Sequence, residues 1–231
     1  VAVPTIRTIF DLARTPDNAV NVTVVGHQFW WELIYEDYGF VTANELHIPV
    51  GRPVALTLKS VDVIHSYWIP PLAGKTDVIP NRVNHMHLEA DAAGTYLGQC
   101  TEYCGLSHAN MRAKAIAQPP DEFEAWVQAQ KRGPAAAPAS GPAATGFNLF
   151  TSKGCAGCHT IEGLSTGSVG PNLTHLQSRT TFASVLFDMT APNLAKWLKN
   201  PPAEKPGAQM PNLNLTPGEI EQLVAYLEIL Q

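Results

Sequence analysis

Hydrophobic positions follow two different periods along the chain. Before residue 119, apolar and polar residues alternate over short stretches, as in His85–Leu88, and proline or glycine separates one stretch from the next. Period-two stretches rich in β-branched and aromatic residues are typical of strands. The predicted strands are Val20–Tyr35, Asn44–Val50, Pro53–Ser60, Arg82–Ala90, Thr95–Cys100 and Met111–Gln118. This pattern predicts an all-β antiparallel sandwich or barrel.

A helical period begins at residue 119. Pro119–Arg132 carries apolar residues on one face, and Ala144–Ser152 and Asn193–Asn200 read as further helices. Thr216–Leu230 has the strongest signal, because a threonine N-cap precedes a proline and then a glutamate at the third helical position. Its apolar residues fall on one face at helical spacing: Ile220, Leu223, Val224, Leu227 and Leu230. The last part of the chain is therefore predicted to be all-α.

The clearest boundary is the segment 133–145, which consists largely of alanine and proline and has no charged residue. Such a segment is expected to be extended and semi-rigid. We therefore predict a first domain over 1–132, a linker over 133–145 and a second domain over 146–231.

Composition excludes several classes of protein. Charged residues make up 15% of the chain and the net charge is -5, which argues against a disordered polyelectrolyte and against nucleic-acid binding. No run of about 18 apolar residues is present, so no membrane span is expected. Residues 1–9 lack the features of a signal peptide, and the chain begins as if a preceding segment had been removed.

The run Cys155-Ala156-Gly157-Cys158-His159 matches C-x-x-C-H, the attachment motif of c-type haem. Two thiols three residues apart share a helix face, so both can bond one porphyrin edge while His159 turns to the iron. A redox cysteine pair or half of a zinc site are the alternatives, and the helical flanks disfavour the first. Met210, in a proline-rich stretch, is the predicted second axial ligand, and Met189 is its rival.

Residues 146–231 resemble the class I cytochrome c domain. The resemblance is carried by Gly146-Phe147, the CAGCH run, Gly170-Pro171-Asn172-Leu173, Met210-Pro211 and Tyr226. It implies that the Pro171 carbonyl accepts a hydrogen bond from His159, and that Phe147 packs on Tyr226 where the first and last helices cross.

A second group of ligand-type residues spans 100–111. Cys100, Cys104, His108 and Met111 lie within twelve residues, and His65 offers a second imidazole. Two thiolates and two imidazoles suit zinc, whereas a thioether with thiolates favours copper. A single blue copper needs only one cysteine, so the extra thiolate is explained if two coppers share both sulfurs. Dinuclear copper, zinc, a disulfide and mononuclear copper all remain open from the residues alone.

Residues 20–130 resemble the periplasmic domain of cytochrome c oxidase subunit II. The matching stretches are Gly26–Trp31, Asp62–Ser66, Lys75–Pro80 and Gly98–Met111. The resemblance implies a cupredoxin-like sandwich with a dinuclear CuA centre. Its implied ligands are His65, Cys100, Cys104, His108, Met111 and the backbone carbonyl of Glu102. A CuA domain fused to a cytochrome c domain is similar to subunit II of bacterial caa-type oxidases.

Two departures from that family stand out. The family carries two transmembrane helices ahead of the copper domain, and their absence here is expected to reflect a truncated, soluble fragment. The family usually has Trp-Tyr-Trp where this chain has Phe29-Trp30-Trp31. Since the first of those tryptophans is thought to receive electrons from a docked cytochrome, electron entry through Phe29 is in doubt.

The resemblance implies a function at the periplasmic face of a bacterial cytoplasmic membrane. Electrons from a cytochrome c or a bc complex would enter at the haem, pass to CuA and leave to oxidase subunit I. The chain would act in catalysis only as part of that oxidase, and the Glu102 carboxylate would bind a magnesium ion shared with subunit I. The remaining histidines, His27, His47, His85, His87 and His175, are expected to be structural or exposed.

Alternative functions are a stand-alone periplasmic electron shuttle and a zinc-stapled binding module fused to a cytochrome. A nitrous oxide reductase, which also uses CuA, needs a large further domain for which 231 residues leave no room.

Overall fold

A computed structural model describes all 231 residues. The chain divides into two compact units. The first comprises Val1–His27, Trp31–Cys104 and Arg112–Lys131, and the second comprises Gln28–Trp30, Gly105–Met111 and Arg132–Gln231.

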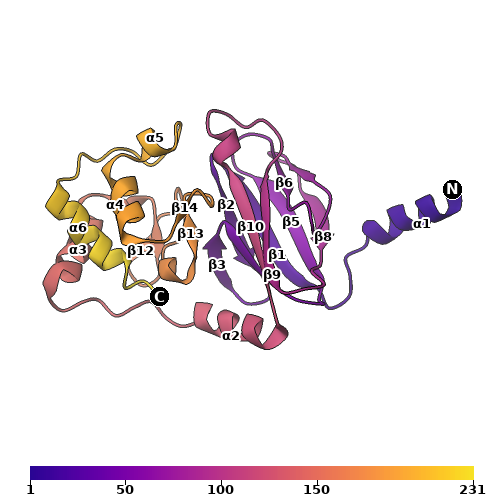
Figure 1. Cartoon of the computed structure of the whole chain (residues 1–231), viewed down its shortest axis with the longest axis horizontal. Helices are drawn as coiled ribbons and strands as arrows, with labels where there is room; N and C mark the ends of the chain where they lie inside the picture. The colour runs from indigo at the N-terminus through magenta and orange to yellow at the C-terminus, as the bar shows by residue number, and fades with distance from the viewer. The chain divides into compact units, whose positions relative to one another are not determined.

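The first unit is a β-sandwich of two five-stranded sheets (Figure 1). One sheet has the order β3-β2-β1-β5-β8 and the other has the order β4-β10-β9-β6-β7. The strands of the first sheet are β1 (Val20–His27), β2 (Trp30–Tyr35), β3 (Phe40–Ala43), β5 (Val54–Ser60) and β8 (Asn84–Leu88). Those of the second are β4 (Glu45–Pro49), β6 (His65–Trp68), β7 (Thr76–Val78), β9 (Gly94–Cys100) and β10 (Arg112–Gln118). Fully buried side chains from both sheets, such as Leu33, Leu46 and Leu58, form the core.

The prediction of a sandwich is confirmed, but its purely antiparallel form is wrong. β1 pairs with β5 in parallel, and β10 pairs with β4 in parallel. Alternation fixes which side chains face the core, whereas the direction of a neighbouring strand depends on long-range pairing that alternation does not encode. The predicted strand Val20–Tyr35 is also two strands, β1 and β2.

Two helices flank the strands of the first unit in the sequence. Helix α2 (Pro120–Gln130) lies where the apolar pattern predicted it and buries Phe123 and Val127. Helix α1 (Ala2–Leu12) was not predicted, and none of its residues is buried. None of the helices combines the length and the apolar composition that spanning a bilayer requires.

The second unit contains the three predicted helices of the C-terminal part, α3 (Gly141–Ser152), α4 (Ala191–Lys199) and α6 (Pro217–Leu227). The short helix α5 (Pro201–Glu204) was not predicted, and the 3₁₀ turns η2 (Cys155–Gly157) and η3 (Leu176–Ser178) lie between α3 and α4. Two hairpins of two-residue strands, β11–β12 (Thr160–Ile161 with Ser165–Thr166) and β13–β14 (Thr181–Phe182 with Phe187–Asp188), interrupt the helices. The predicted capping box is present, since Thr216 accepts from the Glu219 N–H while the Glu219 carboxylate accepts from the Thr216 N–H.

Helices α3 and α6 cross in close contact (Figure 1). The rings of Phe147 and Tyr226 meet edge to face, with centroids 5.5 Å apart, which confirms the packing that the cytochrome resemblance implied. Helix α3 also corrects the predicted linker. It begins at Gly141, with Pro142 in its first turn, so residues 141–145 are helical and not extended. Proline in a first turn favours a helix start, and the alanines that follow are strong helix formers.

Candidate metal centres

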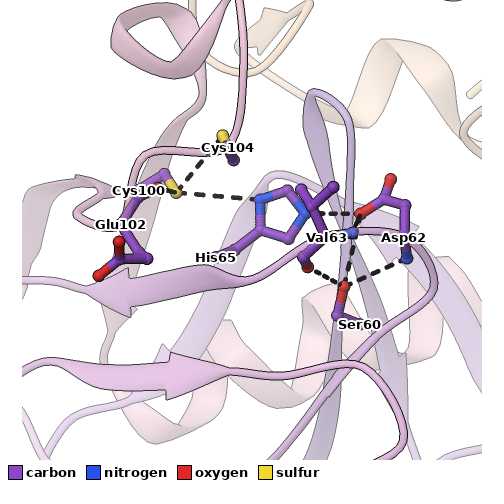
Figure 2. Close-up of polar contacts among 7 residues, drawn as sticks. All are labelled: Ser60, Asp62, Val63, His65, Cys100, Glu102 and Cys104. Atoms are coloured by element: carbon purple, nitrogen blue, oxygen red, sulfur yellow. Dashed lines mark hydrogen bonds and ion pairs between the residues drawn. The ribbon is translucent and has the colours of Figure 1, made fainter.

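A buried cluster of His65, Cys100 and Cys104 lies in the first unit (Figure 2). His65 opens β6, Cys100 ends the neighbouring strand β9, and Cys104 follows in the loop after it. The Cys100 sulfur lies 3.8 Å from the Cys104 sulfur and 3.9 Å from His65 Nδ1. One ligand atom from each residue lies within 4.8 Å of the others, which is close enough for shared metal ligation.

Asp62 orients the imidazole of this cluster. Its Oδ1 lies 2.8 Å from His65 Nε2 and also accepts a hydrogen bond from the Val63 N–H at 2.6 Å (Figure 2). Because a carboxylate accepts, Nε2 carries the proton and Nδ1 keeps its lone pair on the side of the sulfurs. Metal-binding histidines are commonly held in this way by a carboxylate. In the sequence, Asp62 was recognised only as part of the stretch Asp62–Ser66, and its contact with the imidazole was missed. The signal that could have revealed this contact is a carboxylate three residues before the proposed ligand His65.

The two cysteines of the cluster form no disulfide, and their thiols differ in acidity. The neighbouring Cys104 thiol and the His65 imidazole lower the pKa of Cys100 to about 3. The same contact with Cys100, together with burial, raises the pKa of Cys104. Burial works to lower the pKa of His65, but hydrogen bonds to Asp62 and Cys100 outweigh it, and the pKa is raised. A separation of 3.8 Å excludes the disulfide alternative in this structure, because a disulfide needs about 2.05 Å.

Glu102 sits between the two cysteines, with its backbone and side chain in different surroundings. Its carbonyl oxygen lies 3.3 Å from the Cys100 sulfur. Its side chain is exposed, and Figure 2 shows the carboxylate directed away from both sulfurs. The structure thus brings the Glu102 carbonyl to the cluster and leaves the carboxylate on the surface.

His108 and Met111 follow Cys104 in the segment Gly105–Met111. His108 begins the short 3₁₀ turn η1 (His108–Asn110) and is partly buried. Met111 is fully buried and comes directly before β10. Their part in the ligand set stays a prediction.

Aromatic residues pack against the buried imidazole. The indole of Trp31, which is fully buried, meets the His65 ring edge to face with centroids 5.7 Å apart. Gly26 lies so close that a Cβ there would approach His65 Cδ2 to 2.8 Å. These contacts restrain the ring, so a bound metal would find it already in place.

The C-x-x-C-H run of the second unit is folded as a tight turn. Cys155–Gly157 forms η2, and the His159 N–H donates to the Cys155 carbonyl at 3.0 Å. In a 3₁₀ turn, residues three apart lie on one side, so Cys155 and Cys158 lie on the same side of this turn. Both are partly buried free thiols. The α-helix expected here is therefore a 3₁₀ turn, and attachment of haem to its cysteines stays a prediction.

His159 is held by a hydrogen bond to the backbone. Its Nδ1 donates to the Pro171 carbonyl at 2.8 Å, which confirms the bond that the resemblance implied and leaves Nε2 for iron. Burial lowers the pKa of His159, so the ring is neutral at physiological pH. A Cβ on Gly170 would overlap this ring, so only glycine fits there.

Met210 and Met189 are both partly buried against the helical core. The Met210 sulfur lies 3.1 Å from Trp197 Nε1, a contact that the sequence did not reveal. The preference for Met210 as the second axial ligand stays a prediction. The thiols of Cys155 and Cys158, which form no disulfide, and a His159 ring whose Nδ1 is engaged by Pro171 fit a covalent haem.

Comparison with known proteins decides the family. The model of the cytochrome c oxidase subunit II periplasmic domain matches residues 40–117, and the cytochrome c model matches residues 143–231. Cytochrome c oxidase subunit 2 of Alkalihalophilus pseudofirmus is 39% identical over 238 residues, covering 100% of this chain and 69% of that protein. The chain belongs to the cytochrome c oxidase subunit 2 family.

A second relative agrees with this assignment. Cytochrome c oxidase subunit 2 of Bacillus sp. strain PS3 is 35% identical over 247 residues, covering 98% of this chain and 69% of that protein. The crystal structure of the periplasmic domain of cytochrome oxidase subunit II from Bradyrhizobium japonicum matches 51% of this chain and 97% of its own, with 28% identity and a TM-score of 0.49.

Family membership confirms the recognition made from motifs. The chain is the electron-transfer subunit of a haem-copper oxidase, an oxidoreductase. Its oxidase domain implies the CuA copper and its cytochrome c domain implies haem. The matched oxidase domain is a periplasmic one.

Proposed function

We propose that this chain passes electrons from a covalently attached haem to a dinuclear copper centre and on to the large oxidase subunit. The observation that carries the proposal is the buried group of two sulfurs, 3.8 Å apart, with the Nδ1 of an imidazole 3.9 Å from one of them. Two shared thiolates allow one electron to be spread over two metals, so bond lengths change little between redox states and transfer is fast.

Cys100 and Cys104 would hold both coppers between their sulfurs in this proposal. His65 Nδ1 and His108 would each bind one copper, and the Glu102 carbonyl and Met111 would be weak axial ligands. The Asp62 carboxylate supports this assignment, since its bond to Nε2 fixes the His65 tautomer that leaves Nδ1 unprotonated.

Cys155 and Cys158 would bond the haem, with His159 and Met210 as axial ligands. Haem with histidine and methionine ligands supplies a one-electron centre of raised potential. The Pro171 carbonyl supports the assignment, because it keeps the proton of His159 on Nδ1. Trp197 supports Met210, since its N–H holds the thioether in one orientation.

The exposed Glu102 carboxylate is proposed to bind magnesium together with subunit I. A carboxylate is a hard ligand suited to magnesium, and this one points away from the sulfurs. Glu102→Gln keeps the carbonyl, so the copper spectrum of this chain should stay unchanged. In the assembled oxidase the same change should lower magnesium content and turnover. Normal magnesium and turnover there would favour a stand-alone shuttle.

We further propose that residues 1–132 form the copper domain, that residues 146–231 form the haem domain and that the segment between them is a tether. The donor in this proposal is a cytochrome c or a bc complex at the periplasmic side of the membrane. A covalently tethered haem would supply electrons without the surface tryptophan that Phe29 replaces.

Single-electron injection into the oxidised, metal-loaded chain tests the proposal. The haem should be reduced first, and its absorption should then decay as the copper band bleaches. The decay rate should not depend on protein concentration, because donor and acceptor share one chain. A rate proportional to concentration, or no copper reduction, would contradict transfer within the chain.

A further inference from the structure

The turn that joins β5 to β6 is built around the hydroxyl of Ser60. Ser60 is the last residue of β5, and its Oγ lies 2.5 Å from the Val63 carbonyl oxygen and 3.3 Å from the Asp62 backbone nitrogen (Figure 2). Asp62 Oδ1 is farther away, at 3.4 Å. A hydroxyl has one proton, so it donates to the Val63 carbonyl and accepts from the Asp62 N–H. One small side chain therefore closes the turn directly before His65.

The closed turn holds the Asp62 carboxylate in one direction. The Val63 N–H donates to Asp62 Oδ1 at 2.6 Å, and His65 Nε2 lies 2.8 Å from the same oxygen. Val63 is thus bound on both sides, through its carbonyl by Ser60 and through its N–H by Asp62. Any movement of this peptide unit would move the oxygen that accepts from the imidazole.

Hydrophobic packing contributes little to the conformation of this turn. Residues 61–64 belong to no helix or strand, and the side chains of Val61 and Ile64 are 62% and 45% exposed. A segment with few buried apolar contacts is free to open locally unless polar contacts hold it. The contacts of the Ser60 hydroxyl are of that kind.

The end of β5 also supports the imidazole through a second route. Ser60 is paired with Gly26 of β1, and the Val61 N–H donates to the Gly26 carbonyl at 3.2 Å. Gly26 in turn lies against the carbon atoms of the His65 ring. The strand end therefore holds the ring carbons through Gly26 and Nε2 through the turn.

We propose that Ser60 is a positioning residue of the copper site, whose hydroxyl sets the direction of the hydrogen bond between Asp62 and His65. This inference rests on the proposed binding of copper by His65. With the turn closed, Nε2 keeps its proton and Nδ1 keeps its lone pair, 3.9 Å from the Cys100 sulfur. Without the hydroxyl, the carboxylate is free to move, and the ring loses the contact that fixes its tautomer and direction.

Three variants isolate the hydroxyl. Ser60→Ala removes a single oxygen atom, so the fold should persist. Ser60→Thr keeps the hydroxyl and adds a methyl group, which a strand accommodates. Thr57→Ala is the matched control, because it removes a hydroxyl from the same strand at a position that contacts His85 and not the turn.

The first measurement uses the full chain without metal. Nuclear magnetic resonance of ¹⁵N-labelled histidine follows the Nε2 proton of His65, which is assigned as the signal lost in His65→Asn. This proton should exchange slowly with water in the wild type, in Ser60→Thr and in Thr57→Ala. In Ser60→Ala the exchange should be about fivefold faster or more, since one hydrogen bond that opposes local opening is gone.

The second measurement uses the same chains titrated with copper. Ser60→Ala should bind copper about tenfold more weakly, which is typical for loss of a contact that orients a ligand. Pulsed electron paramagnetic resonance should show a changed coupling to the histidine nitrogen in this variant. Ser60→Thr and Thr57→Ala should match the wild type in affinity and coupling.

Wild-type proton exchange and copper affinity in Ser60→Ala would overturn the inference. Equal losses in Ser60→Ala and Ser60→Thr would also overturn it, because the fit of the side chain and not the hydroxyl would then be responsible. Failure of the wild-type chain to bind copper would instead overturn the proposed function and, with it, this inference. That failure is recognisable by itself, since the exchange measurement needs no copper.

Discussion

Gly146 on α3 lies directly against the backbone carbonyl of Gln222 on α6. A Cβ on Gly146 would overlap that oxygen and would also approach the Tyr226 Cβ to 2.8 Å. The close approach of the two helices is what allows Phe147 and Phe150 to pack on the Tyr226 ring. A side chain at position 146 must therefore push the helices apart.

Gly146→Ala should destabilise the haem-binding part of the chain by at least about 2 kcal/mol, because the obstacle is backbone and cannot rotate away. Gly218→Ala is the control, since nothing lies within 4 Å of its added Cβ. That change should be neutral or stabilise α6 by up to about 1 kcal/mol. Denaturation followed at the haem band measures both. Equal effects of the two substitutions would contradict the close crossing.

Elements that depend on neighbouring residues in the sequence were predicted correctly. Pairings between residues far apart in the sequence were missed. The Thr216–Glu219 capping box and the apolar face of α2 are local signals, and both are present. The parallel pairing of β1 with β5 joins residues more than thirty positions apart, and no local pattern encodes it. Strands β6 and β7, of four and three residues, are too short to show a period.

The candidate sites divide in the same way. The C-x-x-C-H run and the cysteine-rich loop are contiguous motifs, so the ligand types could be read from the sequence. The contact of Trp197 with Met210 and the isolation of His175 depend on side-chain packing, and neither has a sequence signature. His175 was expected to be structural or exposed, and it is buried without a partner.

Met210→Ala should convert the haem from low spin to high spin and lower its potential, because a thioether ligand favours ferrous iron. Optical spectra and a redox titration of the haem measure these changes, and the copper spectrum should stay as it is. Met189→Ala is the control and should leave the haem low-spin. A low-spin spectrum in Met210→Ala with loss in Met189→Ala would assign the ligand to Met189.

Cys100→Ser should abolish the mixed-valence two-copper resonance, because each sulfur is proposed to bridge both metals. Met111→Leu should keep both coppers and change the spectrum only slightly, since an axial thioether is a weak ligand. Electron paramagnetic resonance of the copper-loaded variants measures the difference. A mixed-valence signal that survives Cys100→Ser would rule out bridging.

His47 should make the first unit sensitive to acid. Its ring stacks on Trp126 with centroids 4.1 Å apart, and burial lowers the pKa of His47 from 6.5 to about 4. In the unfolded chain His47 is protonated below about pH 6.5, whereas in the folded chain it is protonated only below about pH 4. Stability should therefore be complete above pH 6.5 and fall by up to about 3 kcal/mol as the pH drops to 4.

His47→Gln should lower stability at pH 7, because it removes the stacking and weakens the bond to Gln118, but it should flatten the decline between pH 6.5 and 4. Denaturation of the first unit at several pH values, followed by tryptophan fluorescence, measures this slope. His85→Gln, on an exposed position of β8, is the control for loss of an imidazole. An unchanged slope in His47→Gln would show that another group causes the acid sensitivity.

One chain is proposed to hold both a dinuclear copper centre and a covalent haem. Metal analysis of the chain, reconstituted with copper and matured with haem, distinguishes this arrangement from a zinc site. We expect about two copper atoms and about one iron atom per chain, with no stoichiometric zinc and with haem that stays attached after denaturation. One zinc atom without copper, or haem that is released on denaturation, would contradict it.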